Sequence, residues 1–353
     1  MFQSGWALYR GTAEAPKPLF LHLEPTGACN LQCVMCPRAK SITRQLGHMP
    51  FELFERICLE VDPVFVAFVG FGEPLLHPEI VDMVKWCVRH KKITRISTNA
   101  TVLDSSLSRR LIEAGLHQIW FSFDSPDKEN FEKIRKGADF EKVISNISDF
   151  MTIRKKLGSR MAVTMNFTLI RENMHELPRM LQFAYEKMHI KPTFARSYGY
   201  DIQAQQDRTV HDETEISGYI KEALGMAASM GLGDVKHNLE TILNDIAHPL
   251  KEGPCYFPYY VVAVSCDGKI SPCCLFYDYQ MDVGDLNRCS FDEIWNGRQY
   301  KKFRKELRFR RNAMRICGTC PLNDISLHNM MHQIQRIPGI KLLTKERYAF
   351  LQR

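Results

Sequence analysis

The chain has 353 residues, of which 45% are hydrophobic and 25% charged, and its formal net charge is +7. That length suits one large domain with a smaller one, because domains rarely exceed about 250 residues. No stretch approaches the roughly 18 consecutive apolar residues of a membrane helix, and the opening MFQSGWALYR lacks the basic and then apolar layout of a secretion signal. We therefore expect a cytoplasmic protein without a membrane partner.

Six apolar, β-branched runs predict buried strands, at residues 18–26, 64–70, 93–98, 118–124, 161–169 and 192–197. Helical periodicity lies between them, at residues 50–61, 77–90, 104–114, 140–157 and 174–188. A tight turn cannot join parallel neighbours, so this alternation needs helical crossovers. We expect an α/β fold, a partial (β/α)6 barrel or an open wound sheet, with its site at the carboxyl ends of the strands.

After about residue 235 the alternation ends and a smaller α+β unit with the later cysteines follows. Residues 237–248 indicate a helix, 251–258 a Gly/Pro-rich junction, and 259–265 with 269–271 a hairpin around Asp267-Gly268. The predicted division is an N-terminal extension (1–17), the barrel (18–235), a small C-terminal Cys-rich domain (236–325) and a basic tail (326–353).

The chain has twelve cysteines, and in a reducing compartment clustered thiols bind metal or do chemistry more often than they pair as disulfides. Cys29, Cys33 and Cys36 form C-x-x-x-C-x-x-C directly after the first expected strand. Three thiolates this close can hold three irons of a four-iron cluster and leave the fourth iron open. The alternatives are a zinc knuckle with a distant fourth ligand and ordinary buried cysteines. The position at the carboxyl end of a barrel strand favours an active site.

This segment, EPTGACNLQCVMCPR, resembles the signature of the radical S-adenosylmethionine (SAM) superfamily. In that family SAM chelates the open iron of a [4Fe-4S] cluster. The resemblance implies reduction of the sulfonium, giving methionine and a 5′-deoxyadenosyl radical that removes a hydrogen atom from the substrate. It also implies an electron donor such as flavodoxin or ferredoxin.

The resemblance extends along the chain to further residues that would bind SAM. Met35 matches an apolar position expected near the adenine, and Gly70-Phe71-Gly72-Glu73-Pro74 resembles the family's G-G-E-P loop, with Phe71 in place of the second glycine or inserted before it. A free ammonium needs acceptors such as this carboxylate. Polar residues at the strand ends resemble family positions that contact the ribose and the methionine carboxylate: Ser97, Thr98, Asn99, Ser122 and Asp124, with Asn166 and Arg196 as further candidates.

Cys255, Cys273, Cys317 and Cys320 supply four more thiolates, enough for a four-iron site or a zinc site. The segments VSCDGKISPCC, GDLNRCSFDEIWNG and ICGTCP resemble the SPASM or shortened twitch domain of many radical SAM enzymes. Because the dense later run of cysteines is missing, this resemblance implies one auxiliary [4Fe-4S] cluster. Cys274 could replace Cys273 as a ligand.

Four cysteines remain outside both groups. Cys58 and Cys87 fall on expected helices and are interpreted as packing residues. Cys266 and Cys289 are most simply small buried residues, and the alternative is that one of them donates a hydrogen atom to a substrate radical.

The favoured reaction is oxidation of an alcohol on a small polar substrate, such as a sugar, an aminocyclitol or a nucleotide-linked sugar, because an auxiliary cluster can accept the electron. The expected first barrel strand begins at residue 18, which leaves no room for the leader-peptide domain of many peptide-modifying relatives. The alternatives within the superfamily are a radical epimerase, a sugar-acid decarboxylase or dehydratase, and a peptide-modifying enzyme.

The late basic stretch KKFRKELRFRRNAMR is most simply a solvated helix face, and a patch for phosphate or an acidic partner is the alternative. A non-catalytic zinc or iron–sulfur protein bound to RNA is disfavoured, since base-stacking aromatics do not alternate with this run. The sequence does not indicate an oligomeric state.

Overall fold

The computed structural model describes residues 13–39, 42, 46–197, 213–247, 255, 257–274, 276, 281, 283–318 and 320. The predicted basic tail, most of the predicted N-terminal extension and most of the junction at 251–258 lie outside these residues, and the predicted domain boundaries remain predictions. None of the described helices is long and apolar enough to cross a membrane.

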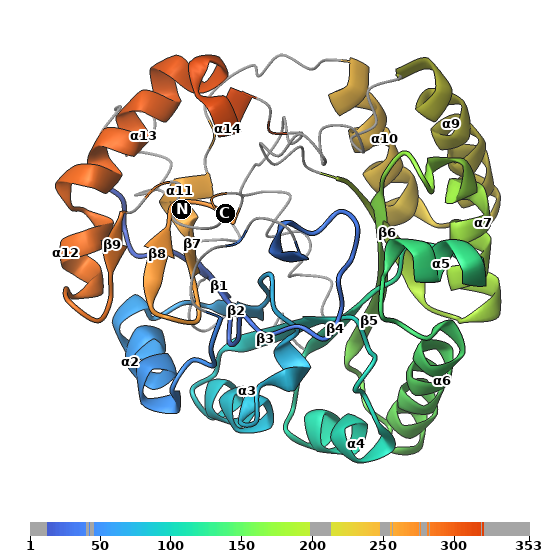
Figure 1. Ribbon diagram of the computed structural model, residues 1–353, viewed down its shortest axis with the longest axis horizontal. Coiled ribbons are helices and arrows are strands. Elements are labelled where there is room, and N and C mark those ends of the chain that lie inside the picture. The colour runs from blue at the N-terminus through green and yellow to red at the C-terminus, as the bar shows by residue number, and fades with distance from the viewer. Residues whose placement is uncertain are drawn as a thin grey trace.

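A single curved sheet with an open edge forms the centre of the molecule (Figure 1), in the order β6-β5-β4-β3-β2-β1-β7-β8-β9. All pairings from β6 to β7 are parallel, and β8 and β9 join antiparallel. This confirms the expected partial barrel. The strands are β1 (Phe20–Leu23), β2 (Phe65–Phe68), β3 (Ile93–Thr98), β4 (Gln118–Ser122), β5 (Ala162–Leu169), β6 (Lys191–Arg196), β7 (Val261–Val264), β8 (Lys269–Ser271) and β9 (Gly284–Asp285).

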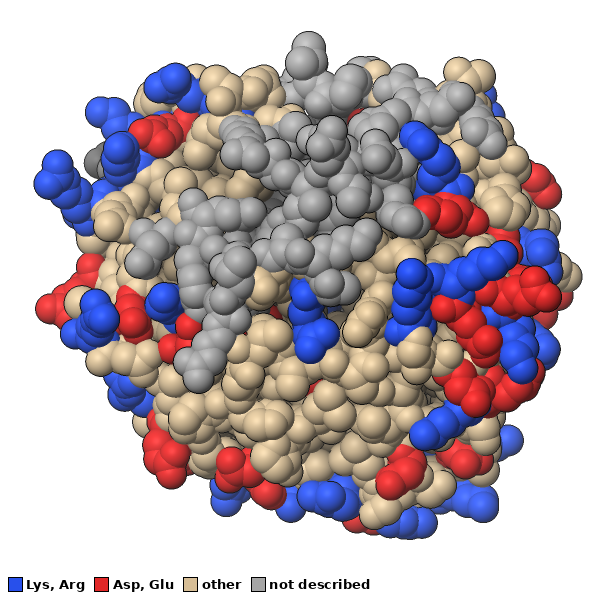
Figure 2. Space-filling view, in the orientation of Figure 1, with Lys and Arg blue, Asp and Glu red and all other residues tan. Residues whose placement is uncertain are grey.

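Helices cover the convex face of the sheet (Figure 1). The barrel helices are α2 (Phe51–Val61), α3 (Ile80–Arg89), α4 (Ser105–Glu113), α5 (Lys128–Ile134), α6 (Phe140–Lys156), α7 (Leu177–Gln182), α9 (Glu213–Ser229) and α10 (Gly233–Ala247). The later helices are α11 (Phe257–Tyr260), α12 (Phe291–Trp295), α13 (Arg298–Arg310) and α14 (Arg315–Gly318). Charged side chains gather at the rim of the face in Figure 2, and uncharged residues cover much of its lower centre.

The two faces of the sheet differ in polarity because successive side chains point to opposite sides. On β5, Met165, Phe167 and Leu169 are buried, whereas Thr164 and Asn166 on the other face are half-buried. Burying each such large apolar side chain contributes about 1.5–3 kcal/mol. The apolar face therefore packs on the helices, and the polar face lines the lumen.

The predicted hairpin around Asp267-Gly268 is present, and it also extends the barrel sheet. β7 pairs parallel with β1, from Phe20 opposite Val261 to Leu23 opposite Val264. No local pattern predicts this pairing, since β1 and β7 are far apart along the chain. The C-terminal cysteines are thereby attached to the strand that leads into the first cysteine motif.

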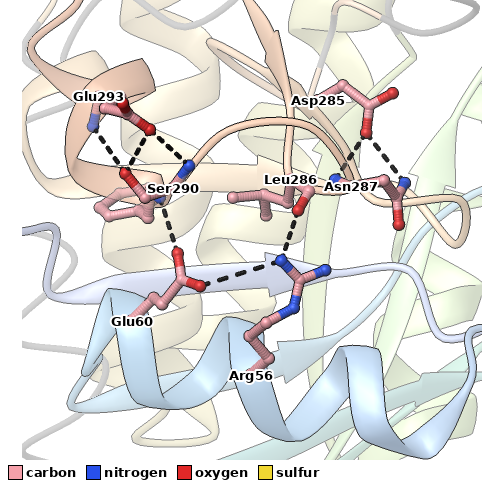
Figure 3. Close-up of polar contacts among 8 residues, drawn as sticks. Arg56, Glu60, Asp285, Leu286, Asn287, Ser290 and Glu293 are labelled. Carbon is pink, nitrogen blue, oxygen red and sulfur yellow. Dashed lines mark hydrogen bonds and ion pairs between the residues drawn. The ribbon is translucent and has the colours of Figure 1, made fainter.

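Polar contacts fix the C-terminal region to α2 (Figure 3). The Arg56 guanidinium donates to the carbonyl of Leu286 at 2.6 Å, and the Glu60 carboxylate accepts from the backbone N–H of Phe291 at 2.7 Å. Ser290 and Glu293 form a reciprocal capping box that begins α12. These contacts hold α12 against the barrel.

Arg304 on α13 is the central anchor of the C-terminal region, and it is fully buried. Its guanidinium donates to the carbonyls of Pro258 at 2.9 Å and Trp295 at 2.8 Å, and it lies 4.3 Å from the Trp295 ring centre. Burying a guanidinium costs free energy, and these hydrogen bonds, with the contact to the Trp295 ring, offset part of that cost. Arg304 therefore ties together α11, α12 and α13.

Candidate iron–sulfur and SAM site

A cavity of about 260 Å³ lies at the carboxyl ends of the barrel strands. All three cysteines of the first motif line it. Its lining consists of Cys29, Leu31, Cys33, Met35, Cys36, Pro37, Val69, Gly70, Phe71, Gly72, Glu73, Ser97, Thr98, Asn99, Ser122, Arg135, Thr168 and Ser197.

The backbone of the cysteine loop, residues 29–36, is hydrogen-bonded to the last residue of α5 and to the segment that follows this helix. Gln32 N–H donates to the carbonyl of Lys136 and Val34 N–H to that of Ile134, both at 2.9 Å. These two hydrogen bonds are spaced as between paired β-strands, and they fix the position of the loop backbone. The three cysteines are therefore presented on a supported backbone.

The burial of the three thiols makes their charged thiolate form unfavourable unless a metal ion is bound. Burial raises the pKa of Cys33 to about 12 and that of Cys36 to about 11, and it also raises the pKa of Cys29. The ligand form is the thiolate, which a bound metal stabilises where burial disfavours it. Three such donors around one cavity fit the three protein ligands of a four-iron cluster with one open iron.

Glu73 carries the sole carboxylate among the described residues that line the cavity, and its oxygens are already engaged. Oε1 accepts from the Thr98 hydroxyl at 2.7 Å, and Oε2 accepts from the backbone N–H of Asn99 at 2.7 Å. Burial raises the pKa of Glu73, and these hydrogen bonds oppose that rise. Glu73 thus joins the ends of β2 and β3 beside the cysteines.

The Gly-Phe-Gly-Glu-Pro loop needs its glycines because other backbone approaches closely. A Cβ on Gly72 would lie 1.9 Å from the carbonyl oxygen of Thr26, just before the cysteine loop. A Cβ on Gly70 would lie 2.4 Å from the Glu24 side chain, whose Oε2 accepts from Phe71 N–H at 2.8 Å. The loop can support the cysteine loop only without side chains at these two positions.

Met35 provides an apolar wall of the cavity. It packs on a small buried cluster of Val34, Ile134 and Ile170. A thioether on an apolar surface suits the face of a planar ring such as adenine. Contact between Met35 and adenine stays a prediction.

Arg135 is a buried cation at the cavity that the sequence analysis did not select. Its guanidinium lies 2.7 Å from the Asp124 carboxylate, and both side chains are at most 8% exposed. Asp124 also accepts from the backbone N–H of Thr168 at 2.8 Å. Burial raises the pKa of Asp124, and Arg135 opposes that rise. Arg135 thus places a positive charge beside the thiols, and the Asp124 carboxylate balances it.

Most of the predicted SAM-binding residues are brought together at the cavity. These are Met35, Gly70, Gly72, Glu73, Ser97, Thr98, Asn99 and Ser122. Four others do not line it: Pro74, Asp124, Asn166 and Arg196. Pro74 instead begins a short 3-10 helix, Pro74–Leu76, which Glu73 caps.

The positions of Asn166 and Arg196 differ from expectation because of strand periodicity. On β5, Thr168 lines the cavity, and Asn166 lies one side-chain layer below it. On β6, Ser197 lines the cavity, and the preceding residue, Arg196, has the opposite parity. Strand alternation alone could have found Thr168 and Ser197, whereas Arg135 follows a short helix that the sequence pattern did not reveal.

The C-terminal cysteines also gather, around Arg311. Cys317 interacts electrostatically with Cys255, Cys320 and Arg311, and burial raises its pKa to about 12. Burial likewise raises the pKa of Cys255 to about 11. Arg311 is buried, so a positive charge accompanies these thiols as Arg135 accompanies the first group.

Cys273 and Cys274 lie next to this group. Cys273 packs in the same apolar cluster as Cys255 and Cys317. The Cys274 thiol is hydrogen-bonded to Cys273 and to His22 on β1, and these contacts hold its pKa well below the usual value. Both residues remain candidates for the fourth ligand. In the part of the chain that the structure describes, no three Cys, His, Asp or Glu side chains are arranged to hold a single metal ion.

The remaining cysteines separate into two kinds. Cys58 and Cys87 are fully buried in the barrel core, which confirms their interpretation as packing residues. Neither candidate hydrogen-atom donor lines the cavity. Cys266 is buried, 3.4 Å from the position of a Cβ on Gly27, whereas Cys289 is exposed in the turn between β9 and α12.

An open parallel sheet with three thiols at a cavity and further thiols beside it defines an α/β iron–sulfur protein of the partial-barrel class. The sequence model of the Radical SAM superfamily matches residues 23–184, and that of an iron-sulfur cluster-binding domain, SPASM, matches residues 255–321. The chain belongs to the radical SAM superfamily and carries a C-terminal SPASM region. Its cofactors are a SAM-binding [4Fe-4S] cluster, SAM and auxiliary iron–sulfur.

The curated relatives differ in what they modify. The chain is 24% identical to a tungsten-containing aldehyde ferredoxin oxidoreductase cofactor-modifying protein of Pyrococcus furiosus, over 81% of this chain and 83% of that one. It is 31% identical to a PqqA peptide cyclase of Granulibacter bethesdensis, over 47% and 44%. It is 26% identical to a probable GTP 3',8-cyclase of Methanothermobacter thermautotrophicus, over 76% and 88%.

Solved structures share the fold. Native anSMEcpe with bound AdoMet superposes with a TM-score of 0.66 at 20% identity, covering 82% of this chain and 84% of that one. Streptococcus suis SuiB bound to S-adenosylmethionine superposes with a TM-score of 0.65 at 17% identity, covering 84% and 70%. At these identities the likeness concerns the fold alone.

Proposed function

We propose that the chain is a radical SAM oxidoreductase that removes a hydrogen atom from a small polar substrate and oxidises an alcohol. The observation that carries the proposal is the contact between Cys274 and His22, which brings the second cysteine group against the lumen face of β1. β1 leads directly into the first cysteine loop. A substrate in the lumen would then have SAM on one side and an electron acceptor on the other.

The chain's own residues would bind and orient the reactants. The three cysteines would hold the cluster, and the Met35 patch would receive the adenine. The hydroxyls of Ser97 and Ser122 at the strand ends would bind SAM oxygens, as donors and acceptors. When bound, the cluster and SAM supply a 5′-deoxyadenosyl radical.

The oxidation balances with one auxiliary [4Fe-4S] cluster as acceptor. The carbinol carbon loses its hydrogen atom to the 5′ carbon, and the hydroxyl then loses its proton to solvent or a base. The auxiliary cluster, when bound, would accept the remaining electron, and the carbinol would become a ketone. A flavodoxin or ferredoxin would supply the electron that SAM cleavage consumes.

Isotope transfer tests this proposal on anaerobically purified, cluster-loaded enzyme. We expect about eight irons per chain, four for each cluster. With aminocyclitols or nucleotide-linked sugars deuterated at their carbinol carbons, one deuterium should enter 5′-deoxyadenosine. The product should be three mass units lighter than the deuterated substrate, because it loses one deuterium and one hydrogen. Zinc without iron would refute the proposal, and a product only one mass unit lighter than the deuterated substrate would indicate epimerisation, because a hydrogen atom then replaces the deuterium.

The rival reactions leave different products. An epimerase with a cysteine hydrogen donor would incorporate solvent deuterium, and a decarboxylase or dehydratase would release carbon dioxide or water. Cys266 is the better placed donor candidate, since it is buried next to Gly27 whereas Cys289 is exposed. A C266S variant that cleaves SAM but stalls before product would favour epimerisation.

Peptide modification is a second candidate. It is favoured by the 31% identity to a PqqA peptide cyclase over 171 residues. Deuterium transfer from a labelled peptide, with no transfer from the small polyols, would select it.

A further inference from the structure

Three side chains with nitrogen donors lie on the lumen face of the sheet, one layer below the cavity. Arg95 and Trp120 precede Ser97 and Ser122, which line the cavity, by two residues on β3 and β4. A residue two positions earlier on a strand lies on the same face of the sheet, about 7 Å further from the carboxyl end of the strand. His22 is the corresponding residue on β1.

The strand register places His22 and Arg95 in one row across the sheet. His22 pairs with Ala67 on β2, and Ala67 pairs with Arg95 on β3. A methyl group thus separates two long side chains in one row across the sheet.

Two aromatic rings contact the Arg95 guanidinium and leave its N–H groups available to another partner. Its guanidinium carbon lies 4.1 Å from the Trp120 ring centre and 5.4 Å from that of Phe65. Such stacking fixes the plane of the guanidinium without using its N–H groups. Over the described residues, Arg95 has no hydrogen bond or ion pair, and its buried Nε lacks an acceptor. Burial lowers its pKa to about 10, so it remains a cation at neutral pH.

Two further buried nitrogens near Arg95 lack hydrogen-bond partners: Trp120 Nε1 and His22 Nδ1. Cys274 lies next to this group, because its thiol is hydrogen-bonded to His22. Buried polar atoms in native proteins are nearly always satisfied, so each exception needs a reason. Three unsatisfied nitrogens around one cation point to an oxygen-rich, negatively charged ligand.

We propose that Arg95, with Trp120 and His22, binds an oxyanion of the substrate, a carboxylate or a phosphate, while the reacting carbon lies at the cavity above. The inference rests on the proposed function, which takes the lumen as the place of the substrate. A purely structural role would have Arg95 and His22 only balance the charge of Cys274.

Calorimetric titration of the cluster-loaded, SAM-bound enzyme tests the site, with inorganic phosphate and, separately, acetate as probes. We expect one saturable site per chain, and the tighter probe identifies the class of oxyanion. The Arg95→Gln variant should bind roughly 10–100-fold more weakly, the loss expected for a charge-assisted hydrogen bond. W120F, which keeps a ring and loses the N–H, and R95K, which keeps the charge, should show smaller losses.

Arg298→Gln is the matched control, because Arg298 is exposed on α13, and it should bind phosphate as the wild type does. Equal affinity in wild type and R95Q, or no saturable binding of either anion, would overturn the proposal. A shifted visible spectrum of the auxiliary cluster in R95Q with unchanged anion binding would establish the charge-balancing role instead. If the wild type itself does not cleave SAM, the proposed function fails while the titration still decides the anion site.

Discussion

The first cysteine group takes its three thiols from residues 29–36, whereas the second draws its thiols from positions spread over residues 255–320. In the first, one loop hydrogen-bonded to Ile134 and Lys136 sets the spacing of the donors. In the second, a hairpin, an anchoring arginine and a terminal turn must all be in place. We expect a site with all its ligands in one loop to be retained when packing elsewhere is altered. A site with ligands from several elements depends on the packing of the whole region.

Cysteine replacements should separate the two groups most strongly. Cys29→Ala, Cys33→Ala or Cys36→Ala should reduce SAM cleavage to background and remove about four irons per chain. Cys255→Ala should also remove about four irons, but SAM cleavage should remain because the first cavity is intact. Iron and sulfide analysis with a dithionite-driven SAM cleavage assay measures both. Cys58→Ala, in the barrel core, should keep all the iron; loss of SAM cleavage in Cys255→Ala would show that the two groups are not independent.

Gly72→Ala tests how closely the loop after β2 must approach the cysteine loop. The added Cβ would lie 1.9 Å from the Thr26 carbonyl oxygen, so backbone must shift. We expect SAM cleavage to fall about 100-fold, as a displacement of about 1 Å can cause. Gly225→Ala on α9 meets nothing within 4 Å and should leave cleavage unchanged, while stability rises by about 0.5–1 kcal/mol. Normal cleavage by G72A would contradict the close approach.

Arg304→Lys should damage the second region while sparing the first. Lysine cannot reproduce the fork that donates to Pro258 and Trp295, so buried carbonyls lose their partners. The free energy of unfolding should fall by about 2–3 kcal/mol, measured by urea denaturation. SAM cleavage per folded molecule should persist. Arg298→Lys, an exposed position on the same helix, should change stability by less than about 0.5 kcal/mol.

His77 provides a smaller, pH-dependent effect next to the first site. Nε2–H donates to the Met49 carbonyl at 2.9 Å, and Nδ1 accepts from Glu79 N–H at 3.1 Å, so the neutral ring fits. Burial lowers its pKa from the ordinary value of 6.5. A lowered histidine pKa stabilises the fold above pH 6.5, and this contribution is lost as the pH falls through the folded pKa.

The His77→Gln variant should lose this part of the pH dependence and about 1–2 kcal/mol at pH 8. Urea denaturation between pH 5 and pH 8 measures both effects. His237→Gln on α10 is exposed and should follow the wild-type curve. The assigned sign would be wrong if the stability of the wild type rose as the pH fell through this range while the stability of H77Q did not change with pH.

Periodicity and short motifs were enough to determine the barrel and most of its site. β3 has the predicted bounds, and the other five barrel strands lie within or within one residue of theirs, because alternation of β-branched runs with amphipathic helices is a local property. The cysteine loop, Glu73 and the strand-end polar residues were likewise found from the sequence, since parallel strands bring their carboxyl ends to one edge.

Only the tertiary structure decided which side chain of each strand end faces the cavity, and which distant segments meet. Thr168 and Ser197 replace Asn166 and Arg196 there because a shift of one or two residues changes face or depth. The burial of Arg135 against Asp124, the pairing of β7 with β1 and the position of Arg95 over Trp120 join residues far apart along the chain. Such contacts depend on packing between elements, and no local pattern in the amino-acid sequence encodes them.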